Sequence, residues 1–264
     1  MSIHKKNNIS VSGKGQRTLL FMHGFGCDQN VWRQVAPQFS DDYRIVLFDH
    51  VGAGKSDLSQ YNPEKYSTLQ GYADDLIDIV RELELSDPVV VGHSVSAMIA
   101  VLAAVREPEL FSRLVLLAPS PCFLNDGDYV GGFERKDIED LLVAMDSNFF
   151  GWSSMITPVI MGNPERPELA GELHENFCRT DPAIAREFAR VTFLSDSRDQ
   201  LGKLAVPALI VQCSADALAP LAVGDYLHAR LQGSALAVLN ATGHCPHLSA
   251  PAETISVMRG WLRD

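Results

Sequence analysis

The sequence predicts an α/β fold, with an open and mostly parallel sheet, helices on both of its faces and one inserted helical segment. Short β-branched apolar runs alternate with helical patterns along most of the chain. These runs are apolar on both sides, as expected for strands buried on both faces. With 264 residues, 46% of them hydrophobic and 21% charged, the chain can bury a sizeable core.

Six apolar runs are the predicted strands: residues 18–23, 44–49, 88–92, 113–118, 207–213 and 235–240. A weaker alternation at residues 8–12 predicts an antiparallel strand at the sheet edge. Helices are predicted over residues 68–83, 95–106, 220–231 and 253–262. Ser67 or Thr68 is a plausible N-cap for the helix at 68–83.

The alternation stops between residues 133 and 195, where no strand pattern occurs. Helical patterns cover residues 136–147, 149–160, 167–178 and 182–193 instead. We therefore expect residues 1–132 and 196–264 to form the core and residues 133–195 to form a helical cap at the carboxyl edge of the sheet, where such sheets bind ligands. As a group, its large apolar residues are expected to line a pocket, although any one could belong to the cap's own core: Phe149, Phe150, Trp152, Met155, Ile156, Phe188 and Phe193.

The candidate nucleophile is Ser94, which lies between a predicted strand and a predicted helix. The stretch from Gly92 to Ser96 reads GHSVS, close to the G-x-S-x-G elbow that exposes a serine hydroxyl above a sheet. Ser96 occupies the place of the second glycine, and we expect this small side chain to fit. A serine hydroxyl is weak at its free pKa and needs a base, an acid that orients the base and donors for the oxyanion.

The acid is expected after the strand that follows the insertion. That strand leads into Ser214-Ala215-Asp216, so Asp216 is the favoured acid. Asp196 and Asp199 are rivals at the exit of the insertion.

The base is expected after the last strand, where His244 follows Ala241-Thr242-Gly243. The chain order Ser94, Asp216, His244 is the order of this kind of site. His247 is an alternative base, but we expect it to be a surface or supporting histidine.

Two backbone N–H groups are expected to hold the oxyanion. One belongs to Val95, directly after the nucleophile, and the other to Phe25 in the glycine-containing turn after the first strand. The Phe25 ring would then form the floor of the pocket.

Several functions are disfavoured. The net charge of −11 argues against nucleic acids and anionic membrane surfaces as partners. The polar N-terminus and the lack of a long apolar run predict neither a signal peptide nor a membrane span, and five scattered cysteines suggest reduced thiols and a cytoplasmic location.

No cofactor is expected. The stretch from Asp49 to Ser56 ends in GKS like a phosphate-binding loop, but Asp49 stands where that loop needs glycine. No helix pattern follows it, so its glycines are expected to shape a turn beside the active site. The eight histidines are dispersed and no metal-ligand spacing or dinucleotide fingerprint occurs.

Together, several motifs resemble one subfamily of α/β-hydrolases, that of the bacterial stress regulator RsbQ and the plant karrikin and strigolactone receptors. They are HGFGCDQNVW, FDHVGAGKSD, GHSVSAMI, LAPSPCFLND, GGFE and GHCPHLS. The resemblance spans about residues 8–262, and serine in place of the second elbow glycine is typical of the subfamily. Ala100 departs from the glycine common in relatives, which affects helix packing rather than chemistry.

The resemblance implies a four-helix cap over a closed apolar pocket and the triad Ser94, Asp216 and His244. It implies Phe25 and Val95 as oxyanion donors, with a pocket lined by Phe25, His93, Phe133, Trp152, Ile156 and Phe193. It also implies a stress-signalling role with a PAS-domain phosphatase as partner.

Two functions are therefore considered. The first is slow hydrolysis of a small hydrophobic ester or lactone by the serine. The second is a ligand receptor whose cap binds a regulatory partner with little or no turnover; a metabolic esterase without a signalling role is a further alternative. Ser94 disfavours haloalkane dehalogenases and epoxide hydrolases, which use aspartate at the elbow, whereas a cofactor-free dioxygenase or a C–C hydrolase shares this scaffold.

Overall fold

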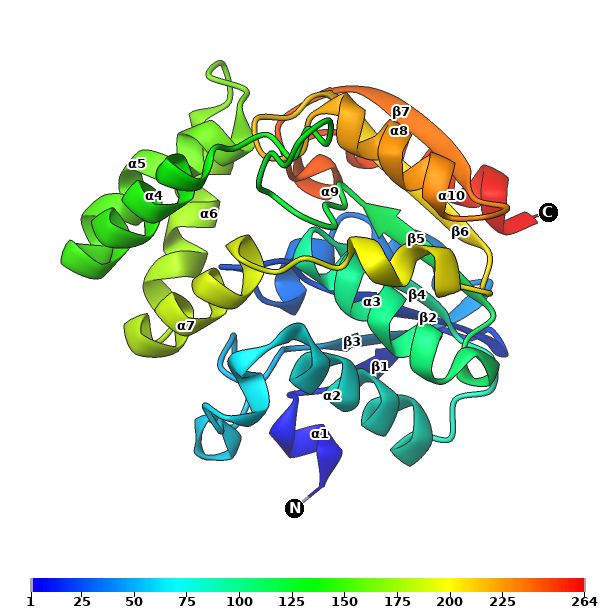
Figure 1. Cartoon of the computed structure of the whole chain (residues 1–264). Coiled ribbons are helices and arrows are strands. Elements are labelled where there is room, and N and C mark those ends of the chain that lie inside the picture. Colours follow the sequence, from blue (N-terminus) through cyan, green and yellow to red (C-terminus); the bar gives the residue numbers. More distant parts are fainter. Residues whose placement is uncertain (1, 264) are drawn as a thin grey trace.

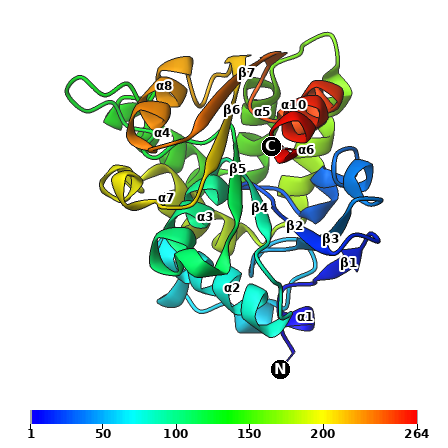
Figure 2. The same cartoon turned by 90° about the vertical axis from the view of Figure 1, so that its right-hand side faces the viewer.

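The computed structural model describes residues 2–263, and within them one sheet of seven strands forms the centre of the molecule (Figures 1 and 2). The strand order is β1-β3-β2-β4-β5-β6-β7, with β1 antiparallel to β3 and all other neighbours parallel. The strands are β1 (Ser10–Ser12), β2 (Arg17–Met22), β3 (Tyr43–Phe48), β4 (Val89–His93), β5 (Arg113–Leu117), β6 (Ala208–Ala215) and β7 (Ala235–Thr242).

Helices cover both faces of the sheet. The α-helices are α1 (Ile3–Lys6), α2 (Leu69–Glu82), α3 (Val95–Arg106), α4 (Arg135–Ser147), α5 (Phe149–Met161), α6 (Pro167–Arg179), α7 (Pro182–Phe193), α8 (Leu221–Arg230), α9 (Pro246–Ser249) and α10 (Pro251–Arg263). Figure 2 shows α2, α3 and α8 on one face and α10 on the other.

Alternate residues of the strands divide the core into two layers. In β2, Leu20 and Met22 pack toward α2 and α3, whereas Leu19 and Phe21 pack toward Trp32 on the opposite face. Each strand therefore contributes to two apolar clusters, which explains its continuous apolar sequence.

The predicted fold class is confirmed, and the predicted strands all occur, with ends that differ from the prediction by at most two residues. The weak alternation near the N-terminus forms β1, antiparallel at the sheet edge as expected. Helices α3 and α7 have the predicted bounds, and α2 begins after Thr68, although the Thr68 side chain makes no capping hydrogen bond.

Helices α4 to α7 lie together on one side of the sheet (Figure 1). Helix α5 packs against α6, and α4 packs against both α5 and α7. Asn148 caps α5 by accepting from the Gly151 N–H, and Asp181 caps α7 by accepting from the Ala183 and Ile184 N–H groups. The division of the chain into a core and a cap at residues 133 and 195 stays a prediction.

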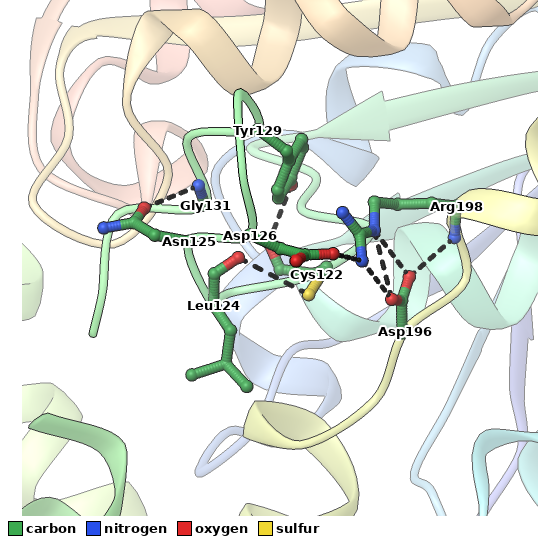
Figure 3. A network of polar contacts seen from close by, with 8 residues as sticks. All are labelled: Cys122, Leu124, Asn125, Asp126, Tyr129, Gly131, Asp196 and Arg198. Atoms are coloured by element: carbon green, nitrogen blue, oxygen red, sulfur yellow. Dashed lines mark hydrogen bonds and ion pairs between the residues drawn. The ribbon is translucent and has the colours of Figure 1, made fainter. Parts of the chain in front are cut away.

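Two segments that are far apart in the sequence, residues 121–131 and residues 196–198, meet in a polar network that we call the neck (Figure 3). The Ser197 N–H donates to the Pro121 carbonyl at 2.8 Å, so the two ends of the intervening segment lie side by side. Arg198 pairs with Asp196 at 2.6 Å and with Asp126 at 2.8 Å, and its guanidinium lies 4.8 Å from the centre of the Tyr129 ring. These contacts join the two segments.

None of the helices in residues 2–263 has both the length and the apolar character that crossing a membrane requires.

Candidate active site

Four loops meet at the carboxyl edge of the parallel strands. Ser94 follows β4, Asp216 follows β6, and His244 follows β7 by two residues. The loop after β2 brings Phe25 to the same edge. Parallel strands end on one side of a sheet, so topology alone collects these distant residues.

Ser94, His244 and Asp216 form a continuous chain of hydrogen bonds. The Ser94 Oγ lies 2.7 Å from His244 Nε2, and His244 Nδ1 lies 2.7 Å from Asp216 Oδ2. With Nδ1 donating to the carboxylate, Nε2 is left to accept the serine proton. The arrangement contains a nucleophile, a base and a group that orients the base.

The Asp216 carboxylate is buried and held by its own loop. Its Oδ1 accepts from the Leu218 N–H at 2.8 Å and the Ala219 N–H at 3.2 Å. Burial acts to raise the pKa of Asp216, but the charge and hydrogen bond of His244, together with these two N–H groups, outweigh it and lower the pKa. The carboxylate is therefore ionised when the base must become positive.

The backbone at Ser94 is strained. Its φ is +55° and its ψ is −121°, a region that side-chain-bearing residues seldom adopt. The Ser94 N–H donates to the Leu117 carbonyl of β5 at 2.8 Å, which ties this sharp turn to the sheet. The turn lifts the hydroxyl toward His244 and begins α3 directly afterwards.

Two N–H groups beside Ser94 remain free to receive an oxyanion. Within residues 2–263, neither the Val95 N–H nor the Phe25 N–H donates a hydrogen bond. Val95 is the first residue of α3, so its N–H has no carbonyl within the helix. A Cβ on Gly24 would lie 2.5 Å from His93 Nδ1 and 3.4 Å from the Ser94 Cβ, so glycine allows the Phe25 loop to approach the nucleophile.

His93 supports the base from behind. Its Nε2 donates to the His244 carbonyl at 2.8 Å, and it lines the pocket beside Ser94. Burial and the nearby His244 lower the pKa of His93 to about 3, so this ring stays neutral.

A small apolar cavity of about 80 Å³ opens beside Ser94 and His244. All six predicted pocket residues line it: Phe25, His93, Phe133, Trp152, Ile156 and Phe193. The prediction did not include the other residues of its wall: Cys27, Phe123, Leu141, Val159, Ile160, Leu173, Thr192, Ala217, Leu218 and Cys245. Leu141 and Leu173 could have been found from the apolar faces of their helices, whereas Ala217 and Leu218 directly follow the candidate acid.

Not every large apolar residue of the insertion faces this cavity. Phe150 and Met155 are 52% and 69% exposed, which corrects the expectation that they line the pocket. Phe149 is buried and stacks on Trp152 instead. Phe188 does not line the cavity, but its ring packs edge-on against Phe25 with 5.8 Å between ring centres. Helix α5 has an exposed face as well as a face toward the cavity, and residue type alone does not distinguish the two.

Two pocket residues are cysteines. Burial raises the pKa of Cys27, with a further contribution from Asp28, and burial also raises the pKa of Cys245 well above its ordinary range. Thiols held protonated in this way are weak nucleophiles. They contribute apolar wall rather than a second reactive centre.

The rival residues lie elsewhere. Asp196 pairs with Arg198 in the neck, and Asp199 accepts a hydrogen bond from the Gln200 side chain, so neither contacts His244. His247 is fully buried between Trp32 and His93, with ring centres 4.6 and 4.5 Å away. The expected surface position of His247 is therefore wrong: α9 turns this ring into the core.

The loop that ends in GKS encloses a carboxylate rather than a phosphate. Asp49 is 1% exposed, and its carboxylate accepts hydrogen bonds from the Gln29 N–H and the Lys55 N–H at 2.8 and 2.9 Å. A Cβ on Gly54 would lie 2.3 Å from Asp49 Oδ2, so this glycine allows the loop to wrap around the acid. In the described part of the chain, no group of three or more His, Cys, Asp or Glu side chains is arranged to hold a metal.

Comparison with known proteins identifies the family to which this arrangement belongs. The family model described as "Alpha/beta hydrolase family" matches residues 19–257. This chain belongs to the alpha/beta hydrolase family. The prediction of an esterase-type α/β-hydrolase is confirmed by this match, by the fold and by its esterase relatives.

The similar proteins include plant receptors and esterases. The Karrikin insensitive 2 receptor CA of Petunia hybrida is 39% identical over 257 residues, which cover 97% of this chain and 95% of the receptor's chain. A strigolactone esterase of Arabidopsis thaliana is 40% identical over 253 residues, covering 96% and 94%. The solved structure of a hydrolase from Oleispira antarctica has a TM-score of 0.97 and 41% identity, covering 100% of this chain and 97% of its own.

Proposed function

We propose that the chain hydrolyses a small hydrophobic ester or lactone through an acyl-enzyme on Ser94. The observation that carries the proposal is the 2.7 Å contact between Ser94 Oγ and His244 Nε2, continued by the 2.7 Å contact to Asp216. Ser94 and His244 lie at the wall of an apolar cavity.

The proposed reaction has two halves. Ser94 Oγ attacks the carbonyl carbon while His244 Nε2 takes the serine proton, and the Phe25 and Val95 N–H groups stabilise the oxyanion. His244 then gives the proton to the leaving alcohol oxygen as the ester bond breaks. In the second half a water loses its proton to His244, adds to the acyl carbon and releases the carboxylic acid, and Ser94 recovers its proton.

The cavity limits the substrate. At about 80 Å³ it holds a compact group rather than a long acyl chain, and its aromatic and aliphatic wall favours an apolar one. Among the similar proteins, one is named a strigolactone esterase and another a Karrikin insensitive 2 receptor, and these names support ester hydrolysis and ligand binding as proposed activities of this chain.

A signalling role is the second proposed function. The chain is 39% identical to a protein named as a receptor, and its motifs resemble those of the stress regulator RsbQ. In this role the ligand-bound cap would bind a PAS-domain phosphatase. Exposed apolar side chains on the cap, Val143, Phe150, Met155 and Val159, offer contact area for such a partner.

The first test compares turnover of p-nitrophenyl acetate and butyrate by wild type, Ser94→Ala and Ser120→Ala. We expect a burst of p-nitrophenol that equals the enzyme concentration in wild type, and its loss with a rate decrease of several orders of magnitude in Ser94→Ala. Ser120 is a buried serine that donates to the Cys122 carbonyl, so Ser120→Ala is a matched control that should keep the burst. Equal acylation of wild type and Ser94→Ala would overturn the proposal.

The second test addresses signalling. Ser94→Ala loaded with an uncleaved ester is mixed with a purified PAS-domain phosphatase, and binding is measured by calorimetry. Binding that requires the ligand, and that weakens in Met155→Asp, is the expected result for a receptor. If the phosphatase binds neither the ligand-loaded nor the ligand-free protein and ester turnover is fast, the chain is a metabolic esterase rather than a receptor.

A further inference from the structure

Ser96, where the elbow motif usually has glycine, is bonded to the other side of the active site. Its side chain is fully buried. Its Oγ lies 2.5 Å from the His23 carbonyl and 2.7 Å from His50 Nε2. A serine and a histidine this close could be mistaken for a second catalytic pair.

The assignment of donors and acceptors shows that Ser96 and His50 are not a second catalytic pair. A carbonyl oxygen can only accept, so Ser96 must donate its single proton to the His23 carbonyl. His50 Nε2 must then carry a proton and donate it to Ser96 Oγ. Because its proton points away from the imidazole, Ser96 has no base, and neither Ser96 nor His50 lines the cavity beside Ser94.

The neighbouring imidazole continues the network. The backbone N–H of His50 donates to His23 Nε2 at 3.1 Å, so the His23 ring must carry its proton on Nδ1. His23 Nδ1 lies 2.9 Å from the Gly24 carbonyl and donates to it. Burial and the adjacent His23 hold the pKa of His50 well below its ordinary value, so the His50 ring is neutral with a single donor.

These bonds fix the two peptide groups that precede the Phe25 nitrogen. The Gly24 carbonyl and the Phe25 N–H belong to one planar trans peptide, in which the C=O and the N–H point in opposite directions. Anchoring the carbonyl through His23 Nδ1, and through the Cys27 N–H at 3.3 Å, therefore aims the Phe25 N–H. Ser96 anchors the preceding carbonyl in the same way.

Ser96 lies in α3 directly after Val95, whose N–H is one of the two free donors. The hydrogen bond from Ser96 to the His23 carbonyl therefore connects α3, beside the Val95 N–H, to the loop that carries the other donor, the Phe25 N–H. We propose that Ser96, with His50 and His23, is a positioning residue that sets the separation and direction of the two oxyanion donors. The proposal rests on the proposed function, because it requires an oxyanion formed by attack of Ser94.

The test removes the hydroxyl in two ways. Ser96→Ala deletes the hydrogen bonds, and Ser96→Gly also restores the usual motif residue. Stopped-flow acylation by p-nitrophenyl acetate is expected to slow by about 10- to 100-fold in both, because misdirecting a donor removes part of what an oxyanion donor contributes. The apparent KM should change less than threefold, since the cavity wall is untouched.

Affinity for a transition-state analogue separates positioning from general damage. A trifluoromethyl ketone forms a tetrahedral adduct on Ser94, and its affinity should fall by the same factor as the acylation rate. The pH profile of acylation should keep its wild-type inflection, because the bonds from His244 to Ser94 and Asp216 do not involve Ser96. Ser96→Thr, which keeps the hydroxyl, should recover part of the rate.

Ser120→Ala is the matched control and should acylate like wild type. If Ser96→Ala does not fold, His50→Phe is measured in its place. This variant keeps a ring but loses the donor to Ser96, and it should slow acylation. A wild-type burst that depends on Ser94, with unchanged acylation and analogue affinity in the folded Ser96 variants, would overturn only the positioning proposal. Absence of a Ser94-dependent burst in wild type would overturn the proposed function and this inference with it.

Discussion

Asp216 holds a negative charge in a place where water cannot stabilise it. Two backbone N–H groups and the His244 ring take the place of water, so the carboxylate needs no rearrangement when His244 accepts the serine proton. The same bonds lower the pKa of Asp216 despite its burial. The side chain therefore stays charged and fixed across the neutral pH range.

Asp216→Asn tests this assignment against its sequence rivals. We expect kcat for p-nitrophenyl acetate to fall by about 10⁴-fold, because an amide can hold His244 in the wrong tautomer. Asp199→Asn is the matched control and should leave kcat unchanged, since Asp199 does not contact His244. A loss of less than tenfold in Asp216→Asn, in a protein that unfolds at the wild-type temperature, would contradict the assignment.

For single residues, the sequence predicts which side chains the sheet topology brings together. It does not predict hydrogen-bond partners or burial that depend on tertiary contacts. Ser94, Asp216 and His244 each follow a strand, so their meeting at one edge could be predicted. The partners of Ser96 could not, because no local pattern connects that hydroxyl with the His23 carbonyl 73 residues away. The burial of His247 cannot be predicted from the local sequence either, because it depends on where Trp32 lies in the fold.

The strand–elbow–helix unit depends on one close approach of backbones. A Cβ on Gly92 would lie 2.5 Å from the Ser96 carbonyl oxygen and 2.8 Å from the Ala97 nitrogen. Both are backbone atoms, so no side chain can move aside. The first glycine of the elbow motif is thus required by packing, whereas the second position accepts a serine.

Gly92→Ala should therefore reduce the free energy of unfolding by more than about 2 kcal/mol, as in overpacked cores. Gly171→Ala is the control: Gly171 lies in α6 and a Cβ there would meet nothing within 4 Å, so the protein should gain roughly 0.5–1 kcal/mol from helix propensity. Urea denaturation measures both. Equal stability of the two variants would refute the backbone contact.

Element boundaries show the same limit of sequence interpretation. The interiors of the strands and helices follow from apolar periodicity. The ends of β6 and β7 extend two residues beyond their apolar runs, because the two strands continue to pair after an irregularity between Cys213 and Ala215. Pairing between strands is a property of the sheet, and a single run of residues does not reveal it.

The molecule as a whole contains several imidazoles that are neutral because they are buried. Burial lowers the pKa of His50, His93 and His247, with further contributions from neighbouring histidines. In the unfolded chain these rings take up protons as the pH falls through about 6.5, whereas the folded chain takes them up only at lower pH. The unfolded state then binds more protons, so stability is full above pH 6.5 and falls as the pH decreases below it.

Each such ring should contribute a slope of about 1.4 kcal/mol per pH unit between pH 6.5 and its lowered folded pKa. Free energies of unfolding in urea at pH 7.5, 6.5, 6.0, 5.5 and 5.0 measure that slope. His247→Phe should reduce it by the contribution of one ring, whereas Ser249→Ala, a nearby change without a titrating group, should shift the curve without altering the slope. Identical slopes for His247→Phe and wild type would contradict a neutral buried His247.

The neck at Pro121 and Ser197 has an evolutionary consequence. Because both ends of the intervening segment are hydrogen-bonded to each other, changes of length within it need not alter the register of the sheet. Contacts to the rest of the chain limit this freedom: the His244 N–H donates to the Ile160 carbonyl at the end of α5, the Asn163 side chain donates to the Thr242 carbonyl, and Arg33 pairs with Glu172. A grafted or diverged segment between Pro121 and Ser197 could acquire new ligand preferences, provided that it presents a carbonyl to His244 at that place.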